Sequence, residues 1–173
     1  MKISKKQEIE GGQFFVIAHN IRSIHNVGSV FRNADAFGVD KIFLTGYTGT
    51  PDHPKIHKVA LGAELVVPWE KRRSLGWLLK KLRQDIPKIK IIGLENNINY
   101  PVTQLANFSP KFPLALVLGE ETKGMTKSII TQMDELIEIP MQGIKESLNV
   151  SVACGIALFE IDKKKKFYAL NLP

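Results

Sequence analysis

Short apolar runs alternate with segments of helical periodicity along most of the chain. Phe14–Ala18 and Leu114–Leu118 are apolar at every position, which is typical of strands buried on both faces of a parallel sheet. Further strands are predicted at residues 41–45, 65–67, 89–94 and 136–139. Helices are predicted between them at residues 27–37, 70–86, 126–133 and 150–159. This alternation predicts an α/β fold, a mostly parallel sheet with helices on both faces.

The length and charge of the chain narrow the class of protein. With 173 residues, one domain with a sizeable core is expected, at residues 13–162 between a basic lead-in (1–12) and a basic C-terminal tail (163–173). The net charge of +7 favours a polyanionic partner, nucleic acid ahead of a membrane surface. The single cysteine, Cys154, excludes an intrachain disulfide.

Neither a membrane anchor nor a secretory leader is expected from the sequence. No apolar run approaches the roughly 20 residues of a membrane span. The first twelve residues have lysines but no apolar stretch behind them. The sequence therefore predicts a cytoplasmic protein that does not bind membranes.

Three polar loops follow predicted strands and precede predicted helices, at residues 20–32, 119–124 and 140–149. Ligands of parallel α/β proteins bind beyond the carboxyl ends of the strands, where such loops lie. The loops offer the following polar side chains: Arg22, Asn26, Arg32, Glu120, Glu121, Ser147 and Asn149. The third loop leads from an apolar strand into an apolar helix, and both a ligand site and a plain capped junction fit its sequence.

Several common chemistries lack their sequence signatures. The chain has no GxxxxGK[ST] phosphate loop, and no GxGxxG follows the first strand. His53 and His57 are four residues apart, but Pro54 separates them and no acidic partner is expected nearby, so loop histidines are expected and no metal site. A Ser–His–Asp arrangement would have to use His19 or His25.

Three motifs occur in order along the chain: NIRSIHNVGSVFRNADAFG (20–38), LVLGEETKG (116–124) and IPMQGIKESLNVSVA (139–153). With these motifs the chain resembles the SpoU (TrmH-type) RNA ribose 2′-O-methyltransferases of the SPOUT superfamily. The resemblance covers nearly the whole chain. It implies an α/β fold with a C-terminal trefoil knot, although knots are very rare among known folds.

The same resemblance implies a cofactor, S-adenosyl-L-methionine, bound in the knot between the second and third motifs. The implied cofactor-binding residues, with the last three the weaker candidates, are Gly119, Ile139, Leu148, Leu94, Glu95 and Met141. Backbone groups are expected to make most of these contacts, because side-chain donors are few in this stretch.

The implied catalytic residues are Arg32, Asn26, Glu121, Ser147 and Asn149. A guanidinium is a poor general base, so we hypothesise that Arg32 grips a phosphate and orients the 2′-oxygen, while phosphate or water takes the proton. Asn26 and Glu121 would then orient Arg32. Asn149 would hold the ribose or the loop, or serve as a helix N-cap, and Ser147 could also be partly structural.

The implied partners are RNA and a second copy of the chain. Arg22 and the lysines at 163–166 are predicted to contact RNA, with tRNA favoured because the compact chain resembles the tRNA-acting members, and rRNA as the alternative. Two other functions stay open: a non-catalytic RNA-binding protein of this fold, and a SPOUT enzyme that methylates a base nitrogen or another position. The apolar helix after Asn149 is consistent with a homodimer.

Overall fold

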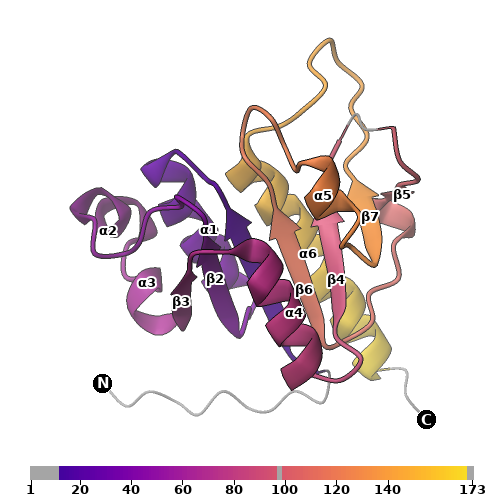
Figure 1. Cartoon of the computed structure of the whole chain (residues 1–173), viewed down its shortest axis with the longest axis horizontal. Helices are drawn as coiled ribbons and strands as arrows, with labels where there is room; N and C mark the ends of the chain where they lie inside the picture. The colour runs from indigo at the N-terminus through magenta and orange to yellow at the C-terminus, as the bar shows by residue number, and fades with distance from the viewer. Residues whose placement is uncertain (1–11, 97–98, 171–173) are drawn as a thin grey trace.

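The computed structural model describes residues 12–96 and 99–170, and it consists of one seven-stranded sheet flanked by helices (Figure 1). The strand order is β3-β2-β1-β6-β4-β7-β5, and every pairing between neighbours is parallel. The strands are β1 (Phe14–His19), β2 (Lys41–Thr45), β3 (Trp69–Arg72), β4 (Lys90–Leu94), β5 (Thr103–Gln104), β6 (Leu114–Leu118) and β7 (Glu135–Glu138).

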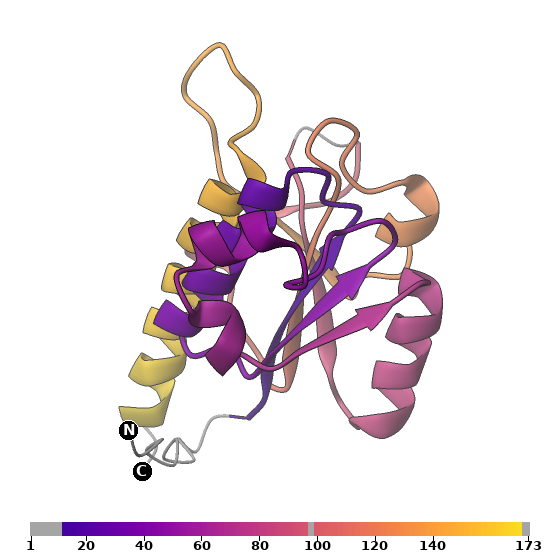
Figure 2. The ribbon, with the colours of Figure 1, turned by 90° about the vertical axis from the view of Figure 1, so that its left-hand side faces the viewer.

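Helices cover both faces of this sheet, as the sequence predicted (Figure 2). The helices are α1 (Ile24–Ala36), α2 (Pro54–Ala60), α3 (Ala63–Val66), α4 (Leu75–Asp85), α5 (Lys127–Ile130), α6 (Val150–Leu170) and the 3₁₀ turn η1 (Leu105–Asn107). Helices α1 and α6 share a core cluster with Val16 and Leu116, and α2 and α3 pack outside α1. Helices α4 and α5 share the other cluster with Ile17 and Val117. Successive residues of a strand thus point alternately into the two core clusters, one on each face of the sheet.

Serine residues cap the N-termini of α1 and α4. Ser23 begins α1 by accepting a hydrogen bond from the N–H of Asn26, and Ser74 begins α4 by accepting one from the N–H of Trp77. Helix α1 therefore begins three residues before the predicted start at Val27. None of the helices in the described residues is long and apolar enough to span a bilayer.

Two predictions for residues 65–86 were wrong. Leu65 and Val66 belong to helix α3 rather than to a strand, and the strand of this region is β3, within the segment predicted as helix. The predicted helix at 70–86 is reduced to α4, because Ser74 caps it after β3 has paired with β2. Helix α5 is likewise shorter than the predicted 126–133.

The C-terminal boundary was also misplaced. Helix α6 runs without a break from Val150 to Leu170, so residues 163–170 continue the helix and do not form a separate tail. Of the expected lead-in, residues 1–11 lie outside the described part of the chain, as do residues 171–173 of the expected tail.

The strand register aligns the carboxyl ends of the strands in a single row. Leu94 of β4 pairs with Leu118 of β6, Leu118 pairs with Ala18 of β1, and Ala18 pairs with Leu44 of β2. The residues that follow these four positions emerge at one edge of the sheet. The polar loops predicted to carry chemistry leave from this edge.

Candidate functional site

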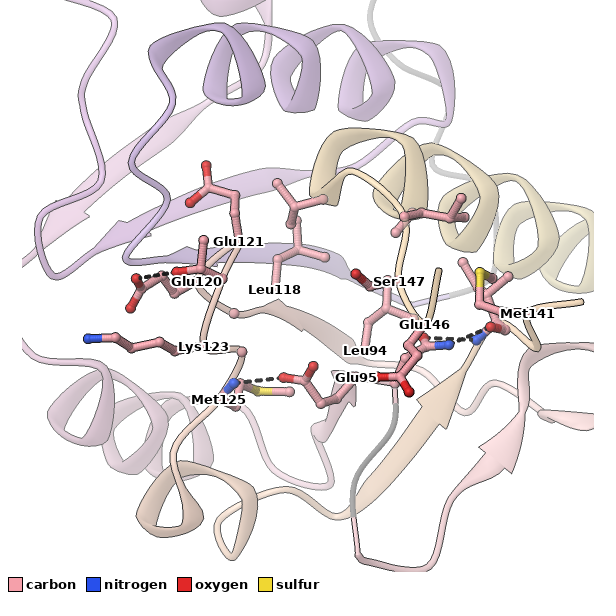
Figure 3. Close-up of a pocket in the computed structure, with 18 residues that line it drawn as sticks. Leu94, Glu95, Leu118, Glu120, Glu121, Lys123, Met125, Met141, Glu146 and Ser147 are labelled. Carbon is pink, nitrogen blue, oxygen red and sulfur yellow. Dashed lines mark hydrogen bonds between the residues drawn. The ribbon is translucent and has the colours of Figure 1, made fainter. Parts of the chain in front are cut away.

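A pocket of about 300 Å³ opens at the carboxyl ends of β4 and β6 (Figure 3). Its walls come from the turns after these strands and from the segment between β7 and α6. All six residues predicted to bind the cofactor line it: Leu94, Glu95, Gly119, Ile139, Met141 and Leu148. The fold therefore brings together residues up to 54 positions apart in the sequence, from Leu94 to Leu148.

Two glycines form one wall of the pocket at positions where a side chain would clash with its neighbours. A Cβ on Gly119 would lie 2.9 Å from the backbone of Gly124 and Met125. Gly124 has a φ of +62°, and a Cβ there would overlap the carboxylate of Glu95. The Gly124 N–H also bonds to the carbonyl of Glu120 at 2.9 Å, which closes the 119–124 turn on itself.

Carboxylates give the pocket a negative character. Glu95 accepts a hydrogen bond from the Met125 N–H at 2.7 Å, and Glu120 accepts one from the Thr122 hydroxyl at 3.1 Å. Burial raises the pKa of Glu95, and the hydrogen bonds from backbone N–H groups only partly offset this. Glu146 also lines the pocket. Mixed apolar walls and carboxylates suit a ligand with a flat apolar part and a positive charge.

A second, more open depression adjoins this pocket and shares part of its lining. It is lined by the following residues: Arg22, Ser23, Asn26, Glu121, Thr122, Leu148, Asn149 and Val150. Glu121, Thr122, Leu148 and Val150 also line the first pocket, so the two cavities meet at these residues. All three polar loops thus contribute to this depression.

Glu121 links the first two loops within this depression. Its Oε2 accepts a hydrogen bond from the Arg22 N–H, and its Oε1 accepts bonds from the Ser23 N–H and the Asn26 side-chain amide, each at 3.0 Å. Burial by itself would raise the pKa of Glu121, but these three donors outweigh it and lower the pKa. Glu121 is therefore an ionised group that holds the start of α1.

Asn149 links the third loop to the same network. Its side-chain N–H donates to Asn26 Oδ1 at 3.0 Å, while its Oδ1 accepts from the N–H and the hydroxyl of Ser151 at 2.9 and 2.7 Å. Asn149 is thus the N-cap of α6 and a partner of Asn26 at once. The N-cap alternative considered for this residue is confirmed, and its contact with a ribose stays a prediction.

Arg32 is not brought to either cavity of its own chain. It is exposed on α1, six residues after Asn26, which is about 600° of helical rotation and so about 120° away from the Asn26 face. The Asn26 side chain bonds both to Glu121 and to Asn149, so the prediction that Asn26 and Glu121 orient Arg32 was wrong for the single chain. Ser147 is exposed and lines the first pocket.

The residues predicted to contact RNA differ in their exposure to solvent and in their contacts within the chain. Arg22 is exposed beside Glu121. Lys164 instead bonds to the carbonyls of Leu105, Ala106 and Phe108 at 3.0, 2.7 and 2.7 Å, so it braces η1 against α6. Lys163 and Lys166 are exposed and pair with Glu160 and Asp162, whereas Lys165 is half-buried and donates to the Gly12 carbonyl.

Sequence reasoning missed Asn96, which anchors the third loop at its start. The Asn96 amide donates to the Ile139 carbonyl at 2.5 Å, and its oxygen accepts from the Ile139 N–H at 3.3 Å. An asparagine two residues after the end of a buried strand was the available signal. Among the described residues there is no group of three or more His, Cys, Asp or Glu side chains that could hold a metal ion.

Comparison with known proteins gives consistent matches along the chain. A model of the SpoU rRNA Methylase family matches residues 13–159. A relative from Vibrio parahaemolyticus, named 23S rRNA (guanosine-2′-O-)-methyltransferase RlmB, is 35% identical over 150 residues, which is 87% of this chain and 59% of the relative. The chain therefore spans about 60% of the length of such curated relatives.

Solved structures share the fold. The TrmH/SpoU tRNA modifying enzyme of A. aeolicus superposes with a TM-score of 0.81 at 26% identity, covering 94% of this chain and 81% of that one. The SpoU methyltransferase AviRb from Streptomyces viridochromogenes, in complex with AdoMet, gives 0.80 at 24% identity, covering 96% and 63%.

Proposed function

This chain belongs to the SpoU rRNA methylase family, and from that membership we propose that it is an S-adenosylmethionine-dependent RNA methyltransferase acting on a ribose 2′-hydroxyl. The observation that carries the proposal is the union of two adjoining cavities. One is lined by all six expected cofactor residues, and the other by the linked side chains of Glu121, Asn26 and Asn149.

The volume and the lining of the first pocket suit S-adenosylmethionine. Its volume of about 300 Å³ lies at the lower end of the range usual for ligand pockets. Leu118 and Ile139 would pack against the adenine, and the close approach of Gly119 and Gly124 leaves backbone groups facing the ligand. The nearby carboxylates would favour its positive charges. When bound, the cofactor supplies a methyl group carried on a positively charged sulfur.

The second depression would receive the nucleotide to be methylated. Asn26 and Asn149 present amides beside the shared wall, and Arg22 offers a guanidinium for a phosphate. Glu121 is a positioning residue in this scheme. Its two oxygens already accept three hydrogen bonds, and its lowered pKa makes it a weak proton acceptor. The hydroxyl proton would leave to a phosphate oxygen or to water.

We propose rRNA as the substrate and no longer favour tRNA. The curated relatives of this chain at 34–35% identity are named for 23S rRNA methylation, whereas the tRNA modifying enzyme is 26% identical. The net charge of +7 suits either RNA, so charge does not decide between them.

A homodimer would complete the site. Helix α6 buries Cys154, Leu158 and Ile161 against the core and exposes an apolar stripe on its other side: Val152, Ile156, Phe159 and Phe167. Such a stripe at helical spacing is what a partner helix covers. Helix α1 packs along α6, so Arg32 would lie near that interface and could reach the site of the partner subunit.

Mixing inactive variants tests the shared site. Arg32→Ala and Asn149→Ala are each expected to abolish methyl transfer. A heterodimer of the two variants is expected to regain one intact site, and so about half of the activity of the wild-type dimer, if Arg32 serves the partner subunit. Absence of recovery, or a monomer by size-exclusion chromatography at micromolar concentration, would contradict this part of the proposal.

Mass-spectrometric mapping of 2′-O-methylated nucleosides tests the function as a whole. A strain without the gene is compared with the same strain carrying the wild-type gene or the Asn149→Ala gene. We expect one ribose methyl mark to be missing from rRNA in the deletion strain and in the Asn149→Ala strain. Loss of a tRNA mark would overturn the choice of rRNA, and loss of no mark would leave a non-catalytic RNA-binding role.

The trefoil knot is part of the same proposal. Family membership supports it, as does the return of the chain from β7, the strand next to the edge strand β5, to α6 beside α1. Single-molecule stretching provides the test. A knotted chain extends to a shorter final contour length than an unknotted chain of 173 residues, and a full-length extension would refute the knot.

A further inference from the structure

Exposed aromatic and cationic side chains continue along the sheet edge beyond the two cavities. Thr45 at the end of β2 pairs with Arg72 at the end of β3, in the same row of strand ends that leads to the first pocket. Tyr47 follows β2 and is 54% exposed, and Trp77 in the first turn of α4 is 51% exposed. We call Tyr47, Arg72, Arg73 and Trp77 the aromatic–arginine surface.

Trp77 and Arg72 form a pair on this surface. The Arg72 guanidinium lies 5.3 Å from the centre of the Trp77 ring and also pairs with Glu70. Glu70 is held in turn by Lys41 at 2.5 Å. Arg72 is thereby kept beside the indole, and half of the Trp77 surface stays open to solvent.

Tyr47 stands on a turn that is fixed on two sides. Its N–H donates to Asn20 Oδ1 at 3.2 Å, and the Lys71 ammonium donates to the carbonyl of Gly46 at 2.8 Å. Gly46 has a φ of +63°, and a side chain there would overlap Asn20. An aromatic ring on such a turn loses little freedom when a ligand binds to it.

Electrostatics connect Tyr47 to the proposed active site. Removal of surrounding water raises the pKa of Tyr47, the neighbouring Glu120 carboxylate raises it further, and the positive charge of Arg22 lowers it. Tyr47 therefore lies close to the first and second polar loops. Arg22 lines the second depression, so Tyr47 lies near the border of that depression.

We propose that the aromatic–arginine surface binds a single-stranded stretch of the RNA substrate, with an unpaired base stacked on Trp77 and phosphates near Arg72 and Arg73. This inference rests on the proposed function. Aromatic faces bind bases of any sequence once they are unstacked, and arginines follow the backbone between them. Strands β3 and β6 are three spacings apart, about 14 Å at about 4.8 Å each, so a short RNA segment spans the distance.

Fluorescence reports on Trp77 directly. The chain has two tryptophans, and Trp69 is only partly exposed. Titration of the wild-type protein with an unlabelled single-stranded RNA oligonucleotide of mixed sequence is expected to quench tryptophan emission. The variant Trp77→Phe should lose this quenching while keeping its affinity near wild type, because phenylalanine retains a stacking face. Quenching that persists in Trp77→Phe would contradict the proposal.

Affinity provides the second measurement. Anisotropy with a dye-labelled copy of the oligonucleotide is expected to give a Kd about 5- to 100-fold weaker for Trp77→Ala than for wild type. The control Leu65→Ala removes another exposed apolar side chain, 78% exposed on α3, and should leave the Kd unchanged. An unchanged Kd for Trp77→Ala would overturn the proposal. It would also be overturned if Trp77 bound a protein partner and RNA did not compete with that partner.

Cofactor binding separates this proposal from the proposed function. Calorimetric titration with S-adenosylmethionine should give the same Kd for wild type, Trp77→Ala and Trp77→Phe, since Trp77 does not line the cofactor pocket. If the wild type methylates RNA but Trp77→Ala binds RNA normally, only the aromatic–arginine surface is refuted. If the wild type binds neither cofactor nor RNA, the proposed function fails first.

Discussion

Glu121 holds the start of α1 against the second polar loop, and we predict that Glu121→Gln destabilises the fold. In the wild type, three N–H donors from Arg22, Ser23 and Asn26 share the two carboxylate oxygens. A glutamine has one oxygen in place of two. That oxygen keeps at most the Ser23 and Asn26 donors, and the new amide N–H group then faces the Arg22 N–H.

The expected size of the effect follows from these contacts. A hydrogen bond to a charged group contributes about 1.5–3 kcal/mol, and one between neutral groups contributes about 1 kcal/mol. The variant loses one charged bond and weakens two others. Because Glu121 is only partly buried, water replaces part of the loss. We therefore expect the free energy of unfolding to fall by about 2 kcal/mol at neutral pH.

The pH dependence of this loss has a definite sign. The folded-state pKa of Glu121 is lowered from its ordinary value of 4.5, so the carboxylate stabilises the fold at pH values above 4.5. That contribution disappears as the pH falls through the folded-state pKa. The difference in unfolding free energy between wild type and Glu121→Gln should therefore shrink on acidification below 4.5.

Urea unfolding followed by circular dichroism, at about pH 7 and at about pH 4, measures both quantities. The control Glu138→Gln removes a carboxylate at the end of β7 that is not part of this network, and it should change the free energy by less than about 0.5 kcal/mol. Equal stability of wild type and Glu121→Gln at neutral pH, or a difference that grows on acidification, would refute the reasoning.

Three further substitutions test the glycine wall and two internal braces. Gly124→Ala should weaken S-adenosylmethionine binding at least tenfold by calorimetry, because its φ of +62° and the adjacent carboxylate exclude a Cβ, whereas Gly143→Ala, with open space around it, should bind normally. Glu64→Gln should lower the free energy of urea unfolding by about 1–3 kcal/mol, since this buried carboxylate loses bonds to a backbone N–H and an imidazole. Its pKa is lowered, so this loss should shrink as the pH falls; a constant loss would contradict it. Lys164→Met should lower the free energy of urea unfolding by about 1–2 kcal/mol, because three hydrogen bonds to carbonyls are lost. The control Lys163→Met should leave this free energy unchanged, and equal effects of the two variants would show that Lys164 does not stabilise the contact between η1 and α6.

The sequence predicts the central strands well and the edge of the sheet poorly. β6 is apolar throughout and β1 is apolar as far as Ala18, because helices cover both faces of the sheet there, and such runs indicate buried strands. β3 is an edge strand, Trp69–Arg72, with three charged residues and no buried position, and no periodicity reveals its pairing with β2. Leu65 and Val66 were mistaken for a strand since they are apolar, yet they are exposed on α3.

The position of the site was predictable, but its internal contacts were not. Motif residues such as Gly119 and Ile139 meet in the pocket because loops after parallel strands share one edge. The partners of Asn26 depend on side-chain direction, which is set by where α1 begins. Since Ser23 starts that helix, Asn26 faces Glu121 and Asn149, and Arg32 falls on another side.

The third polar loop, residues 140–149, is one of the two polar loops that line both cavities. It is anchored just before its start by Asn96 on Ile139 and at its end by Asn26 on Asn149, whereas Ile144 between them is 99% exposed. Leu148 lines both cavities, next to the anchor at its end. A ligand that fixes Leu148 in the first pocket therefore acts on the same short segment that presents Asn149 to the second. We therefore expect binding in one cavity to change the affinity of the other, because Leu148 and Asn149 are joined by one peptide bond.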